Sequence, residues 1–390
     1  MLLPTSLYIH IPWCIRKCPY CDFNSHKSPD ILPETAYFNA LLADLKTDYA
    51  AWPRQKLVSI FIGGGTPSLL SGEFYTTLLQ NLKKIFYFEP NIEITLEANP
   101  GTVEQHRFKE YRQAGINRLS LGIQSFNENH LKRLGRIHDA NQARGAIETA
   151  RNAGFDNINL DIMNGLPEQT VNEGLQDLEM ALSYQPEHLS WYQFTLEPNT
   201  FFYKHPPRLP SEDTCLTIEE KGFDLLVLKG YERYEISAFC QPSKQSQHNL
   251  NYWLFGDYFG IGAGAHGKIT LPVTAQVIRT QKYRQPHEYL DPKKPFLASH
   301  ELVKPHDLLF EFMLNTTRLQ QPIPFTLFEA RTGLFFSSLM PKLREAEEKG
   351  LVRVTKNDWR ITELGRRFTN DLQCLFLIED HEYNRGRSTT

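Results

Sequence analysis

Residues 7–194 alternate short runs rich in β-branched residues with longer amphipathic stretches, and this pattern constrains the fold more than any other feature of the chain. The strand candidates are 7–11, 57–63, 92–98, 118–124, 157–163 and 188–194, and the helical candidates between them are 34–49, 72–86, 103–114, 140–153 and 170–184. Strands and helices that alternate at this spacing favour a parallel sheet with right-handed crossovers. The sequence therefore predicts an α/β fold built on a partial (β/α)6 barrel, short of a full eight-stranded one.

Polar residues stand where these strands end. In a parallel barrel the loops at the carboxyl ends of the strands carry the chemistry, because they can vary without disturbing the core. The residues in such positions are Gly63, Gly64, Gly65 and Thr66 after the second strand, Glu97 after the third, Gln124 after the fourth and Asp161 late in the fifth. We expect them to share one site.

Three of the six cysteines, Cys14, Cys18 and Cys21, follow the first strand in the stretch CIRKCPYC, whereas the other three lie far apart. Clustered thiols in a chain of this length are typical of metal ligands rather than disulfides, and thiolates suit zinc or iron-sulfur clusters. A zinc site would need a fourth ligand, which His10 or His26 could supply. A cluster held by three cysteines would leave one iron open, and the spacing favours this alternative.

The CxxxCxxC motif on the loop after the first strand of a partial barrel resembles the radical S-adenosylmethionine (SAM) enzymes. The resemblance implies a 4Fe-4S cluster on the three cysteines, with SAM bound to the open iron. It also implies that the GGGTP stretch, including Gly64, Gly65 and Thr66, lies against the methionyl amino group. The other positions that match SAM-contacting positions of the family are Glu97, Gln124, Arg136 and Asp161, with Tyr8 and Tyr20 packed at the nucleoside.

The stretches LYIHIPWCIRKCPYCDF, FIGGGTPSLL, LEANPGT, RLSLGIQSF, LGRIHD, DIMNGLPEQT and HNLNYW together resemble the coproporphyrinogen oxidase-related branch over nearly the whole chain. That branch contains the oxygen-independent coproporphyrinogen dehydrogenases, which oxidatively decarboxylate two propionates. It also contains the haem chaperones of the HemW family, which bind haem and deliver it to respiratory proteins. The resemblance thus implies one of two functions of different classes.

Two departures from the dehydrogenase pattern favour the chaperones. Dehydrogenases carry a further cysteine two residues after the third ligand, where this sequence has Phe23, and an N-terminal extension, whereas this sequence reaches its first strand by residue 7. Residues 248–253 match the HNxxYW motif of the chaperones. The resemblance implies His248 as a haem ligand, with Tyr252 and Trp253 packed on the porphyrin, and His266 is a second candidate.

The chain is expected to divide into a radical SAM partial barrel with the cluster loop (1–204), an extension of the barrel with the HNxxYW motif (205–299) and a small C-terminal domain (300–390). The last part reads as helices followed by two short strands around a Lys-Asn-Asp turn, which resembles a winged helix. DNA binding is one interpretation. The 42 basic and 45 acidic residues of the chain favour a packing or lid domain and no nucleic-acid partner.

The beginning of the sequence has no basic n-region, and its apolar run is interrupted by Pro4 and Pro12. No apolar run reaches the length that spans a membrane, so we expect a soluble cytoplasmic protein without an integral membrane segment, while peripheral membrane contact stays open. The partners implied by the resemblance are haem and haem-accepting respiratory proteins. Homodimerisation, and whether SAM is cleaved, stay open at this point.

Overall fold

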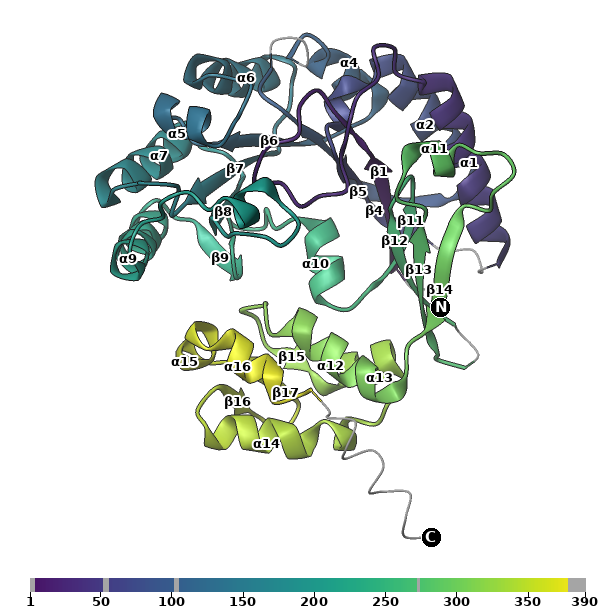
Figure 1. The fold of residues 1–390 in the computed structure, drawn as a ribbon. Helices are drawn as coiled ribbons and strands as arrows, with labels where there is room; N and C mark the ends of the chain where they lie inside the picture. The colour runs from purple at the N-terminus through teal and green to yellow at the C-terminus, as the bar shows by residue number, and fades with distance from the viewer. Residues whose placement is uncertain (1–3, 52–55, 102–104, 272–273, 378–390) are drawn as a thin grey trace.

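A curved twelve-stranded sheet runs through the larger part of the molecule (Figure 1). The computed structural model describes residues 4–51, 56–101, 105–271 and 274–377. Within these ranges the strand order is β14-β13-β12-β11-β1-β4-β5-β6-β7-β8-β10-β9. No described strand pairs across the two ends of this order, so the sheet stays an open partial barrel.

The six predicted strands form the parallel centre of the sheet. They are β1 (Pro4–Ile11), β4 (Lys56–Gly64), β5 (Tyr87–Ala98), β6 (Arg118–Gln124), β7 (Ile158–Asn164) and β8 (His188–Gln193), each paired in parallel with the next. The helices α1 (Glu34–Ala51), α2 (Gly72–Ile85), α4 (Phe108–Ala114), α6 (Ala140–Asn152) and α7 (Val171–Ser183) cover the outer face (Figure 1). The predicted fold class is confirmed. The first residues of the predicted helix 103–114 lie outside the described ranges.

Helix starts follow from local chemistry. Asp139 and Gln142 form a reciprocal capping box at the start of α6, and Thr170 and Glu173 form another at the start of α7. Such pairs satisfy amide groups that the first helical turn leaves without partners.

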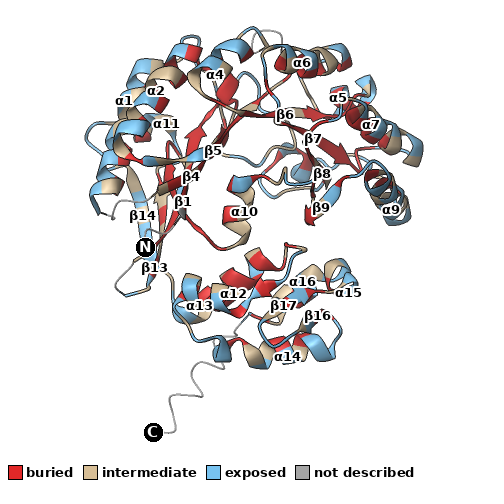
Figure 2. Cartoon of the chain, turned by 180° about the vertical axis from the view of Figure 1, so that it is seen from behind, coloured by how far each residue is buried: buried red, intermediate tan, exposed pale blue. Residues whose placement is uncertain are grey.

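The strands are buried on the face beneath the helices, and the exposed residues lie on the outer sides of the helices (Figure 2). The apolar core therefore lies between the sheet and its helical cover.

The chain adds strands to both edges of the parallel centre after residue 204. On one side, β10 (Ala238–Cys240) and β9 (Glu232–Glu235) follow β8 in antiparallel pairing, after the helix α9 (Glu212–Leu228). On the other side, β11 (Asp257–Ile261) pairs in parallel with β1, and β12 (His266–Thr270), β13 (Val277–Lys282) and β14 (Leu297–Leu302) continue antiparallel. The sequence did not predict the parallel pairing of β11 with β1.

The C-terminal part has its own core. It contains α12 (Pro305–Thr316), α13 (Phe325–Thr332), α14 (Met340–Glu348), α15 (Glu363–Arg367), α16 (Thr369–Cys374) and the small sheet β15-β17-β16, formed by Ile323–Pro324, Asp358–Ile361 and Val352–Val354. Helices followed by the β16–β17 hairpin agree with the predicted winged-helix-like arrangement. In the described part of the chain no helix is both long and apolar enough to cross a membrane.

Contacts hold this C-terminal part against the sheet and against α10 (Gln247–Trp253), which lies in the opening of the partial barrel (Figure 1). The Arg318 guanidinium lies 4.2 Å from the centre of the Trp253 ring and 3.0 Å from the carboxylate of Glu235. The ring of Phe255 packs edge-on against Phe312 at 5.8 Å. The segment that carries the HNxxYW motif therefore connects the two parts of the molecule.

Candidate functional site

A cavity of about 390 Å³ lies at the carboxyl ends of the parallel strands. The predicted site residues that line it are Cys14, Cys18, Tyr20, Cys21, Gly64, Gly65, Thr66, Glu97, Gln124, Arg136 and Asp161. Tyr8 and His248 are not among its lining residues. The parallel arrangement explains this convergence, because every strand that contributes a residue ends at the same rim.

The cysteine loop is fastened at its base by two short parallel strands, β2 (Trp13–Cys14) and β3 (His26–Lys27). Between them, the amide of Cys21 donates to the carbonyl of Cys18 at 3.1 Å. Burial raises the pKa of the Cys14 and Cys21 thiols. Their thiolates therefore need a nearby positive charge, which iron ions supply.

The positions of the donors are compatible with a cluster held by three cysteines. Across the described ranges, no three His, Cys, Asp or Glu side chains lie close enough together to hold one metal ion. Thiolates that each bind a different iron of a cluster do not have to converge on one point. The Tyr8 hydroxyl lies 2.9 Å from Nδ1 of His10, whose Nε2 donates to the Asn24 carbonyl at 2.8 Å. Nε2 of His26 lies 3.2 Å from the Arg284 carbonyl. Of the two predicted fourth zinc ligands, His10 therefore has both ring nitrogens engaged, whereas His26 is engaged through Nε2 alone.

The GGGTP stretch ends β4 directly beneath the cysteine loop. Gly64 has a φ of 114°, and a Cβ atom on it would lie 2.5 Å from the ring of His10. A Cβ atom on Gly65 would lie 2.5 Å from the carbonyl oxygen of Trp13. A side chain at Gly65 would therefore displace the backbone at the start of the cysteine loop, and one at Gly64 would collide with His10 on β1. Thr66 also touches this loop, because its hydroxyl donates to Sγ of Cys14 at 3.4 Å.

Two acidic side chains share the cavity. Burial raises the pKa of Glu97 to about 8, and the neighbouring charge of Asp161 adds to this shift. Glu97 accepts the amide proton of Gly64 at 3.0 Å. Burial also raises the pKa of Asp161, which accepts hydrogen bonds from Ser120 and Asn159 at 2.9 Å each. The raised pKa values mean that this site disfavours the carboxylate forms, and a bound cation, such as the ammonium or sulfonium group of SAM, would favour them.

A hydrogen-bond network joins the remaining lining residues. Arg136 donates to Asn99 at 2.8 Å and to Sγ of Cys18 at 3.7 Å, and Asn99 donates to the Thr66 hydroxyl at 3.0 Å. The Tyr192 hydroxyl donates to the side chain of Gln124 at 2.9 Å. Sequence reasoning missed Asn99 and Tyr192. Their positions at strand ends were a usable signal, since Asn99 lies two residues after Glu97 and Tyr192 lies near the end of β8.

The two predicted nucleoside tyrosines lie in different places. Tyr20 lines the cavity, with its ring edge-on against Phe194 at 6.1 Å. Tyr8 lies on β1, where its ring stacks with Phe61 at 6.3 Å. Tyr8 contacts His10 and Phe61 and does not line the cavity.

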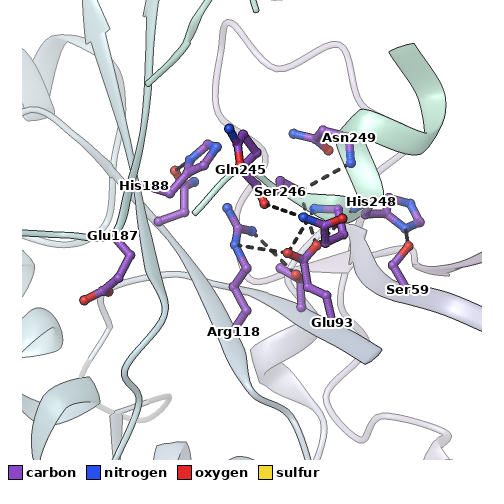
Figure 3. Close-up of polar contacts among 12 residues, drawn as sticks. Ser59, Glu93, Arg118, Glu187, His188, Gln245, Ser246, His248 and Asn249 are labelled. Atoms are coloured by element: carbon purple, nitrogen blue, oxygen red, sulfur yellow. Dashed lines mark hydrogen bonds and ion pairs between the residues drawn. The ribbon is translucent and has the colours of Figure 1, made fainter. Parts of the chain in front are cut away.

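His248 lies on α10 in a buried polar network on the inner side of the sheet (Figure 3). Nδ1 of its ring lies 2.9 Å from the Ser59 hydroxyl, and Nε2 lies 3.0 Å from the Tyr252 hydroxyl. Its backbone amide donates to Glu93, whose carboxylate lies 4.0 Å from Nε of Arg118. Burial and the charge of Arg118 lower the pKa of His248 to about 3.

Haem ligation by His248 stays a prediction. Both ring nitrogens are engaged, so iron could reach Nε2 only if the Tyr252 contact opened. The second candidate, His266, is exposed at the start of β12.

Comparisons with known proteins agree with this geometry. Residues 8–181 match the Radical SAM superfamily, and residues 303–368 match the HemN C-terminal domain. The solved structure of coproporphyrinogen III oxidase (HemN) from Escherichia coli, a radical SAM enzyme, superposes with a TM-score of 0.80 at 22% identity, over 96% of this chain and 90% of that one. At this identity the likeness establishes the fold alone.

Curated relatives narrow the assignment. Proteins named heme chaperone HemW from Haemophilus influenzae and Escherichia coli are each 49% identical, over 97% of this chain and 99% of theirs. The protein of the same name from Bacillus subtilis is 34% identical over 96% of this chain and 99% of its own length. These relatives are named as chaperones rather than as coproporphyrinogen dehydrogenases. The chain therefore belongs to the heme chaperone HemW family of radical SAM proteins.

Proposed function

We propose that this protein is a haem chaperone that binds haem, a 4Fe-4S cluster and SAM, and delivers the haem to respiratory proteins. The observation that carries the proposal is the meeting of three thiols, two acids with raised pKa values and a guanidinium around one cavity. Its relatives with 49% identity are named heme chaperones, which supports the choice of cargo.

Each group has a role in this proposal. Cys14, Cys18 and Cys21 hold the cluster, and bound cluster and SAM together would supply one-electron chemistry. Glu97 and Asp161 bind the cationic groups of SAM, while Arg136 offsets the negative charge of the thiolates through its contact with Cys18. These roles require no rearrangement of the side chains that line the cavity.

A coproporphyrinogen dehydrogenase is the alternative function, since the same SAM-binding cavity would serve radical chemistry. Phe23 favours the chaperone function, because it occupies the position at which dehydrogenases have a further cysteine. Its ring is 58% exposed beside the cavity, so an apolar surface is offered there in place of a thiol.

The deciding experiment compares the two activities in one preparation. The protein is reconstituted anaerobically with iron and sulfide, titrated with haem by Soret absorbance, and incubated in parallel with reductant, SAM and coproporphyrinogen. We expect saturable haem binding and transfer of the haem to a haem-free respiratory cytochrome. Protoporphyrinogen formation without haem binding would overturn the proposal in favour of the dehydrogenase.

Three further points belong to the same proposal. The cytoplasm is the proposed location, since all six cysteines are free thiols, as a reducing compartment would keep them. The division at residues 204/205 and 299/300 is the proposed domain organisation. Homodimerisation through the cluster is an option that size-exclusion chromatography of the cluster-loaded and cluster-free protein tests directly.

A further inference from the structure

A second hollow lies beside the cysteine loop. It measures about 480 Å³ and is lined by Lys17, Cys21, Asp22, Phe23, Asn24, Ser25, His26, Pro198, Asn199, Arg284 and Gln285. We call it the loop groove. Five of these residues, Lys17, Cys21, Asp22, Phe23 and Ser25, also line the main cavity. Residues of the cysteine loop therefore line both the main cavity and the loop groove.

Phe23 lies on this loop as an exposed aromatic residue. A single exposed apolar residue is ordinary on a protein surface and carries nothing by itself. Here, however, the backbone of Phe23 is fixed, because its carbonyl accepts hydrogen bonds from Nζ of Lys17 at 3.1 Å and from the amide of Ser25 at 2.7 Å. An aromatic residue that is 58% exposed on a backbone held in this way offers a flat ligand an apolar face.

The charges of the loop groove favour an anion. Lys17 donates to the backbone carbonyls of Phe23 and Ser25, and neither Lys17 nor Arg284 forms an ion pair with any described residue. Asp22 is the one acidic residue in its lining, against these two cations. Two cations without carboxylate partners complement a ligand with two carboxylates, as the two propionates of haem provide.

An imidazole completes the lining. Nε2 of His26 lies 3.2 Å from the Arg284 carbonyl and 3.3 Å from the side-chain oxygen of Asn24. Since both oxygens are acceptors, Nε2 carries the proton, and Nδ1 is left unprotonated. No described residue forms a hydrogen bond with Nδ1. An imidazole that donates one N–H to a carbonyl and keeps its other nitrogen free is arranged as metal-ligating histidines are.

We propose that the loop groove is the docking site for haem, with the porphyrin on Phe23, its propionates on Lys17 and Arg284, and its iron within reach of His26. The inference rests on the proposed function and deepens it by giving the cargo a place. Haem bound there would contact the cysteine loop, which also lines the main cavity. No movement of α10 would be needed, in contrast to ligation by His248.

The test is anaerobic haem titration of the cluster-loaded protein and of single variants, with iron and sulfide content measured in each. Arg284→Glu places a repelling charge in the loop groove, and Lys356→Glu is its control, an exposed charge reversal outside the lining, in the turn between β16 and β17. Phe23→Ala removes the aromatic face, and Phe335→Ala is its control at a ring that is 80% exposed elsewhere. His26→Gln keeps a donor for the Arg284 carbonyl and removes the ring.

We expect Arg284→Glu and Phe23→Ala each to weaken haem binding by roughly tenfold or more, while both controls stay within about twofold of wild type. His26→Gln should shift the Soret maximum. Haem dimethyl ester, which lacks free carboxylates, serves as a second probe, and Arg284→Glu should leave its affinity unchanged. If Arg284→Glu weakened the binding of haem and of the dimethyl ester equally, the proposed contact between Arg284 and a propionate would be wrong.

Two further outcomes separate this inference from the proposed function. Wild-type affinity for haem in both Arg284→Glu and Phe23→Ala, with the cluster intact, would overturn the loop groove as the site and leave the chaperone function standing. An absence of haem binding by the wild type would overturn both.

Discussion

Replacing Glu97 by Gln should make the protein more stable, and increasingly so as the pH rises. The folded chain holds the pKa of Glu97 at about 8, against 4.5 for the free side chain, because burial and the charge of Asp161 disfavour the carboxylate. Between these two values the folded state holds a proton that the unfolded state releases, so the free energy of unfolding falls as the pH rises. Gln keeps the size and the acceptor for the Gly64 amide but does not titrate.

The magnitude follows from the pKa difference. For each pH unit between the two pKa values, the free energy of unfolding of the wild type falls by about 1.4 kcal/mol. The fall is smaller near the upper pKa value, because Glu97 is there partly ionised in the folded state as well. The stability gap between Glu97→Gln and wild type should therefore widen by about 2 kcal/mol between about pH 6 and about pH 8. Acids that do not interact with Glu97 are common to both proteins and cancel in this difference.

Anaerobic urea unfolding of both cluster-free proteins across this pH range measures the gap. Glu301→Gln, at an exposed position on β14, is the matched control and should give a constant difference. A gap for Glu97→Gln that stays constant, or narrows as the pH rises, would refute the reasoning. SAM should remove the penalty in the wild type, because a bound cation favours the carboxylate.

Replacing Cys14, Cys18 or Cys21 by Ala should abolish the cluster absorption of the reconstituted protein, and full retention of iron and sulfide would contradict the assignment. His248→Ala should cost roughly 2–4 kcal/mol of stability, measured by urea unfolding, because it removes two buried hydrogen bonds and ring packing. Loss of haem binding with unchanged unfolding would instead identify His248 as the ligand. Phe23→Cys should not create dehydrogenase activity by itself, and protoporphyrinogen formation in an anaerobic assay would show otherwise.

The parallel strands and their helices were predictable because their signals are local. A run such as residues 57–63, LVSIFIG, is rich in apolar and β-branched residues whatever its neighbours are, and α6 and α7 begin at residues that cap helices in any context. The parallel pairing of β11 with β1 was not predictable in this way. It joins Thr5 to Asp257, and no local pattern specifies a partner so far along the chain.

The candidate site also has a part that could be predicted from local sequence signals and a part that could not. Strand order brings Glu97, Gln124 and Asp161 to one rim, so their meeting follows once the parallel sheet is predicted. The choice of hydrogen-bond partner depends on side-chain directions that the pattern does not contain, which is why Asn99 and Tyr192 were missed. For His248, the HNxxYW motif identified the residue but not the direction of its ring, which points into a buried network.

Because β11 follows β1 by about 250 residues in the sequence, it is synthesised long after the strand with which it pairs. A nascent chain released only as far as residue 204 would have β1 paired with β4 on one edge, while its other edge, which later pairs with Asp257–Ile261, stayed open. Open strand edges pair readily with other chains. The cysteine loop would also lack its backing, since Asn24 donates to the carbonyls of Ala263 and Arg284. Iron-sulfur assembly should therefore follow synthesis of most of the polypeptide, and fragments that stop earlier should aggregate rather than take up iron.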